Sequence, residues 1–293
     1  MKTLALGEVL WDIIEKVPHL GGAPFNVSAH LSKMGATAYV SSSVGKDALG
    51  EEALKQAKSL GIQMDYLTQN DLPTGTVPVV LTNGQPSYTI TEQVAWDAIH
   101  LSEAQLQEIN RSDWDCVIFG TLAQRTPSNQ ALFEQLLDGI QARVFFYDVN
   151  LRQHYYSKEI VQKSLQKASI FKLNDEEVLI LSDLLFDEQL DFEDFAHRCI
   201  SDFNIVAVCI TRGAEGVLIV TNDQNYDIPG VKVQVADTVG AGDSFSAAFL
   251  YTYLKTTDFQ LAGSIGCRVG AFVASQNGAI PTYSEELKRL LNP

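Results

Sequence analysis

The sequence predicts an α/β fold in which a mostly parallel central sheet is covered by helices on both faces. Apolar runs at residues 117–119, 144–146 and 206–210 alternate with amphipathic stretches such as 129–140, which is the pattern of strand–helix–strand units. A chain of 293 residues that is 46% hydrophobic can bury one large core. Because no Pro/Gly/Ser-rich linker, repeat or low-complexity tract divides it, residues 1–293 are predicted to form a single domain.

The first strand is expected at residues 4–8, and an acidic residue, Asp12, follows it. Gly21 and Gly22 then permit close backbone approach to a ligand, and Asn26 stands where a helix begins. Carboxylate and amide groups suit a polyol, whose hydroxyls must be paired when buried. The open alternatives are that Asp12 is a turn residue and Asn26 a helix cap.

Two segments, residues 9–17 and 76–91, do not fit the layered pattern. The second predicts a hairpin that turns at Asn83-Gly84, a strong hairpin signal. These segments are expected to form a small β element apart from the main sheet. An edge hairpin that serves dimerisation is the alternative, because exposed strand edges tend to be covered.

The strand at 144–147 turns polar at its C-terminal end, with Asp148, Asn150 and Arg152, and this is the edge where open parallel sheets bind ligands. Residues 174–177 read Asn-Asp-Glu-Glu at the start of a helix. Acidic residues in a first turn complement the helix dipole, and we prefer this interpretation for the two residues between Asn174 and Glu177.

A strand at 205–210, a glycine turn and a second strand at 217–220 are expected next. The turn contains Thr211, Gly213 and Gly216. A hairpin with two glycines needs no ligand, so this pattern carries no function by itself.

The segment Asp237-Thr-Val-Gly-Ala-Gly-Asp243 places a carboxylate directly behind a turn built from Gly240, Ala241 and Gly242. Such a turn at a helix start can aim backbone N–H groups at an anion. Asp243 could take a proton from a substrate hydroxyl while the amides stabilise charge on a transferring phosphoryl group. The alternative is that the glycines make a tight turn and Asp243 caps the helix.

This segment resembles the C-terminal signature of the ribokinase-like (PfkB-type) carbohydrate kinases, and further matches run in the family's order from Gly7 to Thr282. The resemblance implies a three-layer α/β/α fold, with the small β element as a lid over the sugar, formed by about residues 8–20 and 74–98. It also implies transfer of the γ-phosphate of ATP to a sugar, with Asp12, Gly22 and Asn26 in the sugar pocket.

The resemblance assigns the other candidate residues as well. It implies that Arg152 contacts substrate or phosphate and that Asn174 and Glu177 place phosphate and Mg²⁺, the latter partly through water, as magnesium usually keeps several waters. It implies a nucleotide site at Thr211, Gly213, Gly216 and Asn277. The segment 273–282 closes over adenine in the family, and in many members a monovalent cation such as K⁺ is held nearby; the candidate residues here are Asp237, Val239, Val273, Gln276, Gly278 and Thr282.

Ala95-Trp96-Asp97 is similar to a segment of bacterial fructokinases in the same family, which implies fructose as the acceptor and contacts of Trp96 and Asp97 with the substrate. An aromatic residue on a closing lid excludes water and limits ATP hydrolysis. Simple packing of Trp96 where the lid rejoins the core is the alternative. Kinases of this family for 2-keto-3-deoxygluconate, ribose or a nucleoside stay open, and the lid edges make a homodimer plausible.

The composition argues against other classes of protein. With 21 basic and 36 acidic residues and a net charge of −15, binding to nucleic acid or anionic membranes is disfavoured. The chain lacks the glycine motifs of dinucleotide-dependent dehydrogenases and Walker-type ATPases. A non-catalytic sugar-binding protein would be expected to lack the base, and Asp243 is present.

The four cysteines show no Cys-x-x-Cys spacing and are expected to be buried thiols, and the five histidines form no zinc pattern. Without a signal peptide or a spanning apolar run, we expect a cytoplasmic protein.

Overall fold

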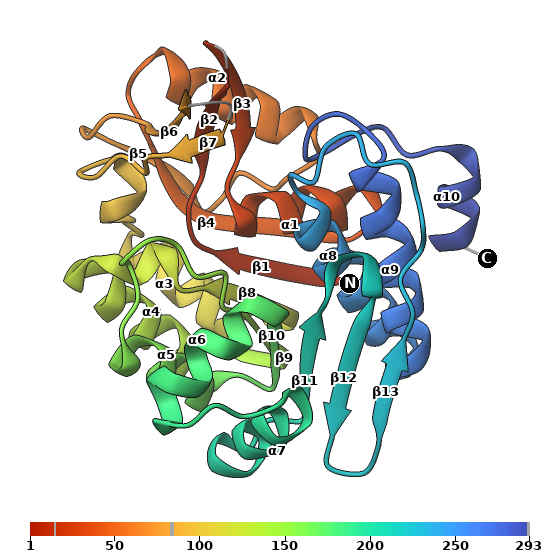
Figure 1. Cartoon of the computed structure of the whole chain (residues 1–293). Helices are drawn as coiled ribbons and strands as arrows, with labels where there is room; N and C mark the ends of the chain where they lie inside the picture. Colours follow the sequence, from red (N-terminus) through yellow and green to blue (C-terminus); the bar gives the residue numbers. More distant parts are fainter. Residues whose placement is uncertain (15, 83–84, 292–293) are drawn as a thin grey trace. The chain divides into compact units, whose positions relative to one another are not determined.

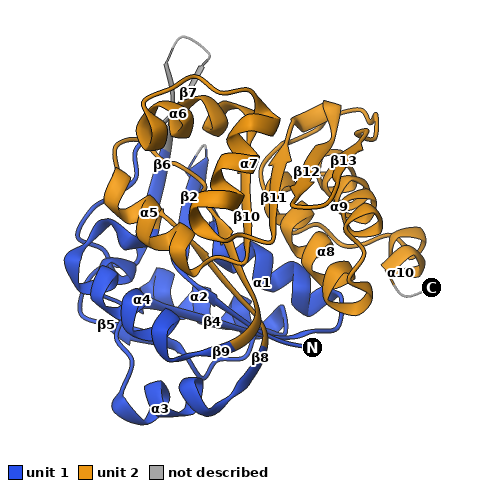
Figure 2. Ribbon diagram, turned by 90° about the horizontal axis from the view of Figure 1, so that it is seen from below, with its two compact units in different colours: residues 1–114, 123–141 blue, residues 115–122, 142–293 orange. Residues whose placement is uncertain are grey.

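The computed structural model describes residues 1–14, 16–82 and 85–291 (Figure 1). Its contacts divide the chain into two compact units, which Figure 2 distinguishes by colour. Unit 1 comprises residues 1–114 and 123–141, and unit 2 comprises residues 115–122 and 142–293. The predicted turn at Asn83-Gly84 lies outside the described residues, and the single domain over 1–293 stays a prediction.

Unit 1 contains a set of three parallel strands and several helices. Its strands β1 (Lys2–Leu6), β4 (Thr37–Gly45) and β5 (Leu67–Asn70) are neighbours in this order, and both pairings are parallel. The helices of this unit are α1 (Ala23–Lys33), α2 (Ala48–Ser59), η1 (Ala95–Ala98), α3 (Glu103–Arg111) and α4 (Pro127–Gly139). The start of α1 follows from Pro24, since proline is tolerated in the first turn of a helix and not in its interior.

A separate sheet in unit 1 has the strand order β3-β2-β6-β7. Its strands are β2 (Leu10–Ile14), β3 (Val17–Gly21), β6 (Gly75–Thr82) and β7 (Gln85–Tyr88). β2 pairs antiparallel with β3 and parallel with β6, and β6 pairs antiparallel with β7. The predicted small β element is therefore confirmed, while its boundaries and its function as a lid stay predictions.

Unit 2 contains the strands β8 to β13 as neighbours in sequence order, with the ends of β8 and β9 assigned to unit 1. The pairings of β10 with β9 and with β11 are parallel, and β11–β12 and β12–β13 are antiparallel. The predicted strand–turn–strand after residue 205 is thus confirmed. The strands are β8 (Asp113–Gly120), β9 (Gln141–Asp148), β10 (Ile170–Asn174), β11 (Ala207–Thr211), β12 (Val217–Thr221) and β13 (Asn225–Ile228).

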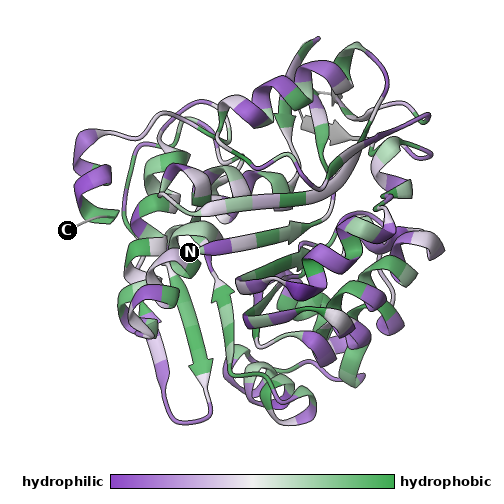
Figure 3. Cartoon of the chain, turned by 180° about the vertical axis from the view of Figure 1, so that it is seen from behind, coloured by the Kyte–Doolittle hydropathy of each residue, from purple (hydrophilic) through white to green (hydrophobic). Residues whose placement is uncertain are grey.

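The helices of unit 2 lie between and after these strands. They are α5 (Lys158–Lys167), α6 (Asp175–Phe186), α7 (Phe192–Phe203), η3 (Gly213–Glu215), α8 (Ala241–Thr256), α9 (Phe259–Ala274) and α10 (Glu285–Leu291), with η2 (Leu122–Arg125) at the boundary with unit 1. The mostly parallel sheet flanked by helices confirms the predicted fold class. In Figure 3 the strands β11 and β12 carry mostly hydrophobic residues, whereas other strands and most helices mix hydrophobic and hydrophilic residues.

Aromatic rings fill the core beside the ends of the central strands. Tyr147 on β9 stacks on Phe119 of β8 and on Phe171 of β10, with ring centroids 5.2 Å and 5.5 Å apart, and all three are fully buried. This row of rings packs across the strands β9 and β10, whose carboxyl ends carry Asp148 and Asn174.

The four cysteines, Cys116, Cys199, Cys209 and Cys267, are free and buried, which confirms that prediction. Burial raises the pKa of each of these thiols, that of Cys267 to about 11. In the described part of the chain, the helices are too short or too polar to cross a bilayer.

Candidate active site

The sugar-pocket residues predicted in unit 1 converge on Gly21. Asp12 is half-buried on β2, and Asn26 is buried in the first turn of α1. A Cβ atom placed on Gly21 would lie 3.0 Å from Asp12 Oδ2 and 4.0 Å from the amide of Asn26. Two side chains 14 residues apart in sequence are thus brought around one glycine, where a hydroxylated ligand would meet both an acceptor and an amide.

Gly22 has a positive φ of 109°, and a Cβ atom there would lie 2.3 Å from the carbonyl oxygen of Glu8. Glycine is therefore required at this position by both backbone conformation and space. Glu8 is buried, and its Oε1 accepts a hydrogen bond of 3.1 Å from the backbone N–H of Ala23 at the start of α1. Glu8 was not singled out from the sequence, because its partner lies 15 residues away.

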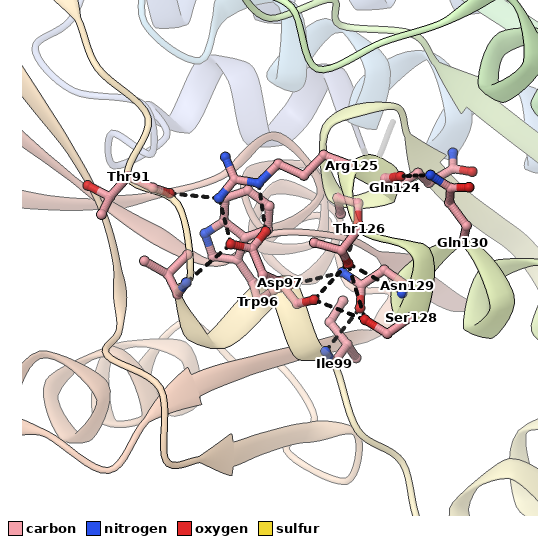
Figure 4. Close-up of polar contacts among 12 residues, drawn as sticks. Thr91, Trp96, Asp97, Ile99, Gln124, Arg125, Thr126, Ser128, Asn129 and Gln130 are labelled. Atoms are coloured by element: carbon pink, nitrogen blue, oxygen red, sulfur yellow. Dashed lines mark hydrogen bonds and ion pairs between the residues drawn. The ribbon is translucent and has the colours of Figure 1, made fainter.

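Trp96 and Asp97, predicted to contact the substrate, lie in a buried cluster with Arg125 (Figure 4). Arg125 donates from Nε to Asp97 Oδ1 at 2.6 Å and from Nη2 to Asp97 Oδ2 at 2.7 Å. Its guanidinium lies 3.9 Å from the centre of the Trp96 ring, and Nη2 also donates to the carbonyl oxygen of Thr91 at 2.7 Å. Arg125 therefore joins η1 to the segment that follows β7.

The contacts of this cluster favour a packing role for Trp96. Its side chain is completely buried, and a Cβ atom on Gly75 would lie 2.2 Å from its Nε1. Asn129 of α4 donates from Nδ2 to the Trp96 carbonyl oxygen at 2.8 Å (Figure 4). A direct contact of Trp96 or Asp97 with the sugar stays a prediction.

The candidate catalytic turn lies at the start of α8 in unit 2. Gly240 has a left-handed conformation with φ 76°, and the helix begins at Ala241. A Cβ atom on Gly240 would lie 2.6 Å from the Cβ of Ala279, so glycine is required here as well. The first N–H groups of a helix have no partner within it and carry partial positive charge. Gly242 is exposed and Asp243 is half-buried in this turn, so an anion can reach both.

The loop before α8 is hydrogen-bonded to the loop after α9. Asp237 Oδ2 accepts from the backbone N–H of Gly278 at 3.2 Å, and Oδ1 accepts from that of Val239 at 3.0 Å. The carbonyl oxygen of Val273 accepts from the N–H of Gln276 at 2.9 Å, while Thr282 is exposed. The structure thus brings Asp237, Val239 and Gly278 together, and binding of a monovalent cation stays a prediction.

Asn174 and Glu177 form a capping box at the start of α6. Asn174 Oδ1 accepts from the Glu177 N–H, and Glu177 Oε2 accepts from the Asn174 N–H, both at 2.8 Å. Glu177 Oε1 accepts from the N–H of Leu151 at 2.8 Å, so each of its oxygens already holds a backbone amide. Burial raises the pKa of Glu177 above its ordinary value of 4.5, more than nearby Lys172 and these amides lower it.

This arrangement limits how Glu177 could serve magnesium. In residues 1–14, 16–82 and 85–291, groups of three or more His, Cys, Asp or Glu side chains placed to hold a metal are absent. Magnesium commonly relies on one or two carboxylates, several waters and substrate phosphates, so the residues present fit a metal that arrives with a nucleotide. The magnesium role of Glu177 stays a prediction.

The predicted nucleotide residues gather at the carboxyl ends of β10 and β11, apart from Asn277. Asn174 and Thr211 are register partners on these strands, and Thr211 Oγ1 donates to the Leu173 carbonyl oxygen at 3.2 Å. Gly213 and Gly216 have φ values of 53° and 95° and make the turn into β12. Asn277 is exposed in the loop after α9.

Arg152, predicted to contact substrate or phosphate, is also exposed and donates from Nη1 to the carbonyl oxygen of Leu151 at 3.1 Å.

A buried ion pair near the catalytic turn was missed by the sequence analysis. Lys172 Nζ donates to Asp148 Oδ1 at 3.0 Å, and Ser246 Oγ of α8 donates to Asp148 Oδ2 at 3.0 Å. Burial alone would lower the pKa of Lys172, but the neighbouring carboxylates, Asp148 first, outweigh it and raise the pKa above its ordinary value of 10.5. The only signal in the sequence was a lysine inside the apolar strand 170–173.

Comparison with known proteins places this geometry in context. A model of the pfkB family of carbohydrate kinases matches residues 13–286. A fructokinase of Vibrio alginolyticus is 28% identical over 92% of this chain and 90% of its own length. A nucleoside kinase of Methanocaldococcus jannaschii is 26% identical over 93% of this chain and 85% of its own length.

Solved structures of two kinases share the fold. Fructokinase from Vibrio cholerae O395, with fructose, ADP and calcium ion bound, superimposes with a TM-score of 0.83 and 21% identity over 99% of each chain. Ribokinase from Thermotoga maritima gives a TM-score of 0.81 and 20% identity, again over 99% of each chain. The predicted ribokinase-like fold is confirmed.

Proposed function

This chain belongs to the pfkB family of carbohydrate kinases and is therefore a phosphotransferase with an alcohol group as acceptor, and we propose that it is a fructokinase. Its donor in this proposal is ATP, used with Mg²⁺. Support for fructose comes from relatives named fructokinase at 27–28% identity and from the Ala95-Trp96-Asp97 segment. The assignment of Asp243 as the catalytic base is supported by its position in the first turn of α8, after Gly240, whose backbone conformation is left-handed.

In the proposed reaction, Asp12 and Asn26 orient the sugar by pairing its hydroxyls. A buried hydroxyl that finds no partner costs free energy, so a carboxylate and an amide around Gly21 favour a polyol over an apolar ligand. The small sheet closes over this pocket and excludes water, which suppresses transfer of phosphate to water. Sugars that lack the matching hydroxyls bind weakly.

Asp243 accepts the proton of a primary hydroxyl as that oxygen attacks the γ-phosphate. The backbone N–H groups of Gly242 and Asp243 face the developing charge, since they lie in the first turn of α8, whereas the N–H of Ala241 donates to the Thr238 carbonyl oxygen at 3.2 Å. Magnesium bound to the nucleotide would neutralise part of the phosphate charge. The buried carboxylate of Glu177 holds the start of α6 in place through its hydrogen bonds to backbone amides.

A second acceptor class is supported by one observation: the relatives at similar identity include a nucleoside kinase. The acceptor pocket, not the phosphoryl-transfer turn, would differ between these activities. A homodimer formed through the small sheet is part of the proposal as well, because Val17 on the edge strand β3 is 53% exposed.

The experiment is a measurement of ADP release from magnesium ATP with a panel of acceptors: fructose, 2-keto-3-deoxygluconate, ribose and a nucleoside. We expect turnover with fructose at the highest kcat/KM. Highest turnover with another acceptor would refute the fructokinase assignment and keep the kinase. Binding of a sugar without ADP release from any acceptor would favour a non-catalytic sugar-binding protein.

A further inference from the structure

We propose that Lys172 is a positioning residue for nucleotide phosphates, acting as a buried positive charge behind the turn that carries Asp243. This inference rests on the proposed function, since it concerns the same phosphate site. Lys172 is the middle residue of β10, and a Cβ atom on Gly242 would lie 3.6 Å from its Nζ. The ammonium group is therefore directly behind the backbone of the first turn of α8.

The position of this ammonium group is fixed from two sides. Lys172 and Asp148 are register partners on the parallel strands β10 and β9, and their side chains are only 9% and 8% exposed. Ser246, one turn after Gly242 on α8, binds the second oxygen of Asp148. The pair thus connects the strands β9 and β10 to the helix whose first turn holds the candidate anion site.

Stability alone gives a weak reason for such a pair. Replacing a buried ion pair by uncharged side chains of similar volume is often neutral or stabilising, because both charges lose their hydration in the fold. A buried ammonium next to an anion site has a further use, since its charge is little screened there.

The carboxylates around Lys172 show what that use is. Asp148, Glu177 and Asp243 all act on the ammonium group electrostatically. Asp243 lies in the turn that a nucleotide phosphate would enter, while Asp148 and Glu177 are buried. The positive charge of Lys172 offsets the negative charge of these carboxylates. Without it, the carboxylates would strongly repel a polyphosphate at the first turn of α8.

The test measures binding of magnesium ADP by calorimetry and of adenosine by displacement of a fluorescent ADP analogue. The variants are Lys172→Met, the double variant Lys172→Met/Asp148→Asn, and Lys163→Met as a control. The double variant removes both charges, so it avoids an unpaired buried carboxylate and keeps the acceptor for Ser246. Lys163 lies on α5 in an exposed pair with Glu159. Circular dichroism and thermal unfolding establish that each variant is folded.

We expect the dissociation constant for ADP to rise about tenfold or more in Lys172→Met and by less in the double variant. Adenosine, which carries no phosphate, should bind every variant as it binds the parent protein, and Lys163→Met should bind ADP normally. Unchanged ADP affinity in both Lys172 variants, or equal weakening of ADP and adenosine, would overturn the inference. Failure of the parent protein to bind ADP would refute the proposed function itself, and that result is separate from the comparison of variants.

Discussion

Asp97 and Arg125 form a two-pronged ion pair inside unit 1, with N–O distances of 2.6 Å and 2.7 Å and side chains that are 7% and 4% exposed. The guanidinium also lies 3.9 Å from the centre of the Trp96 ring, and its Nη2 donates to the Thr91 carbonyl oxygen. Trp96 and Asp97 thus fasten η1, through Arg125, to the segment after the small sheet, and their direct contact with the sugar stays a prediction.

We predict that Asp97→Asn lowers the free energy of unfolding by about 3–5 kcal/mol, because it leaves a buried guanidinium without its counter-charge. Urea denaturation monitored by circular dichroism measures this. Asp71→Asn is the control, since Asp71 pairs with Lys46 on the surface and its loss should not change stability measurably. Normal stability of Asp97→Asn together with weakened fructose binding would instead support direct contact with the sugar.

At the candidate catalytic turn, Gly240→Ala should reduce both stability and turnover. The left-handed backbone costs a non-glycine residue about 1–2 kcal/mol, and the added Cβ would also push against Ala279. Gly35→Ala separates the two effects, because Gly35 has φ 97° but nothing within 4 Å of an added Cβ. Denaturation and ADP-release assays of both variants check this; equal losses of stability would show that the contact with Ala279 has no consequence.

The buried carboxyl of Glu177 should make stability depend on pH. Its pKa is raised in the folded protein, so between 4.5 and that raised value the folded chain binds the proton more tightly than the unfolded chain. The tighter proton binding adds to the free energy of unfolding. This stabilisation is fully present below pH 4.5 and is lost as the pH rises through the pKa of Glu177 in the folded protein. Compared with Glu177→Gln, the parent protein should therefore gain relative stability on acidification through this window. A parallel course of the two stability curves would contradict the assignment.

The parts of the structure that follow from local sequence were predictable. Alternating apolar and amphipathic runs indicated the layered sheet. The resemblance to the carbohydrate kinases predicted which segments bind ligands and their order along the chain. The glycines at 22 and 240 were recognised because a turn at a helix entry needs them, and the structure shows the close backbone and side-chain approaches that enforce this need.

Side-chain pairs between segments that are distant in the sequence could not be predicted in the same way. Lys172 meets Asp148 only because β9 and β10 are neighbours in a particular register, and residue types in two apolar strands do not specify which strands pair. Arg125 meets Asp97 across 28 residues through two short 3₁₀ helices, whose periodicity is too brief to be detected. For the same reason the cluster around Trp96 was interpreted from resemblance alone.

The most direct test of the account is the turnover of Asp243→Asn with fructose and magnesium ATP, measured as ADP release beside the affinity for ADP. Asp258→Asn is the control, because Asp258 caps the neighbouring helix α9 and asparagine caps equally well. We predict that Asp243→Asn lowers kcat by about 10²–10⁴-fold, the usual contribution of a general base, with ADP affinity and Asp258→Asn turnover unchanged. A loss in kcat of less than about tenfold would contradict the assignment of Asp243 as the base.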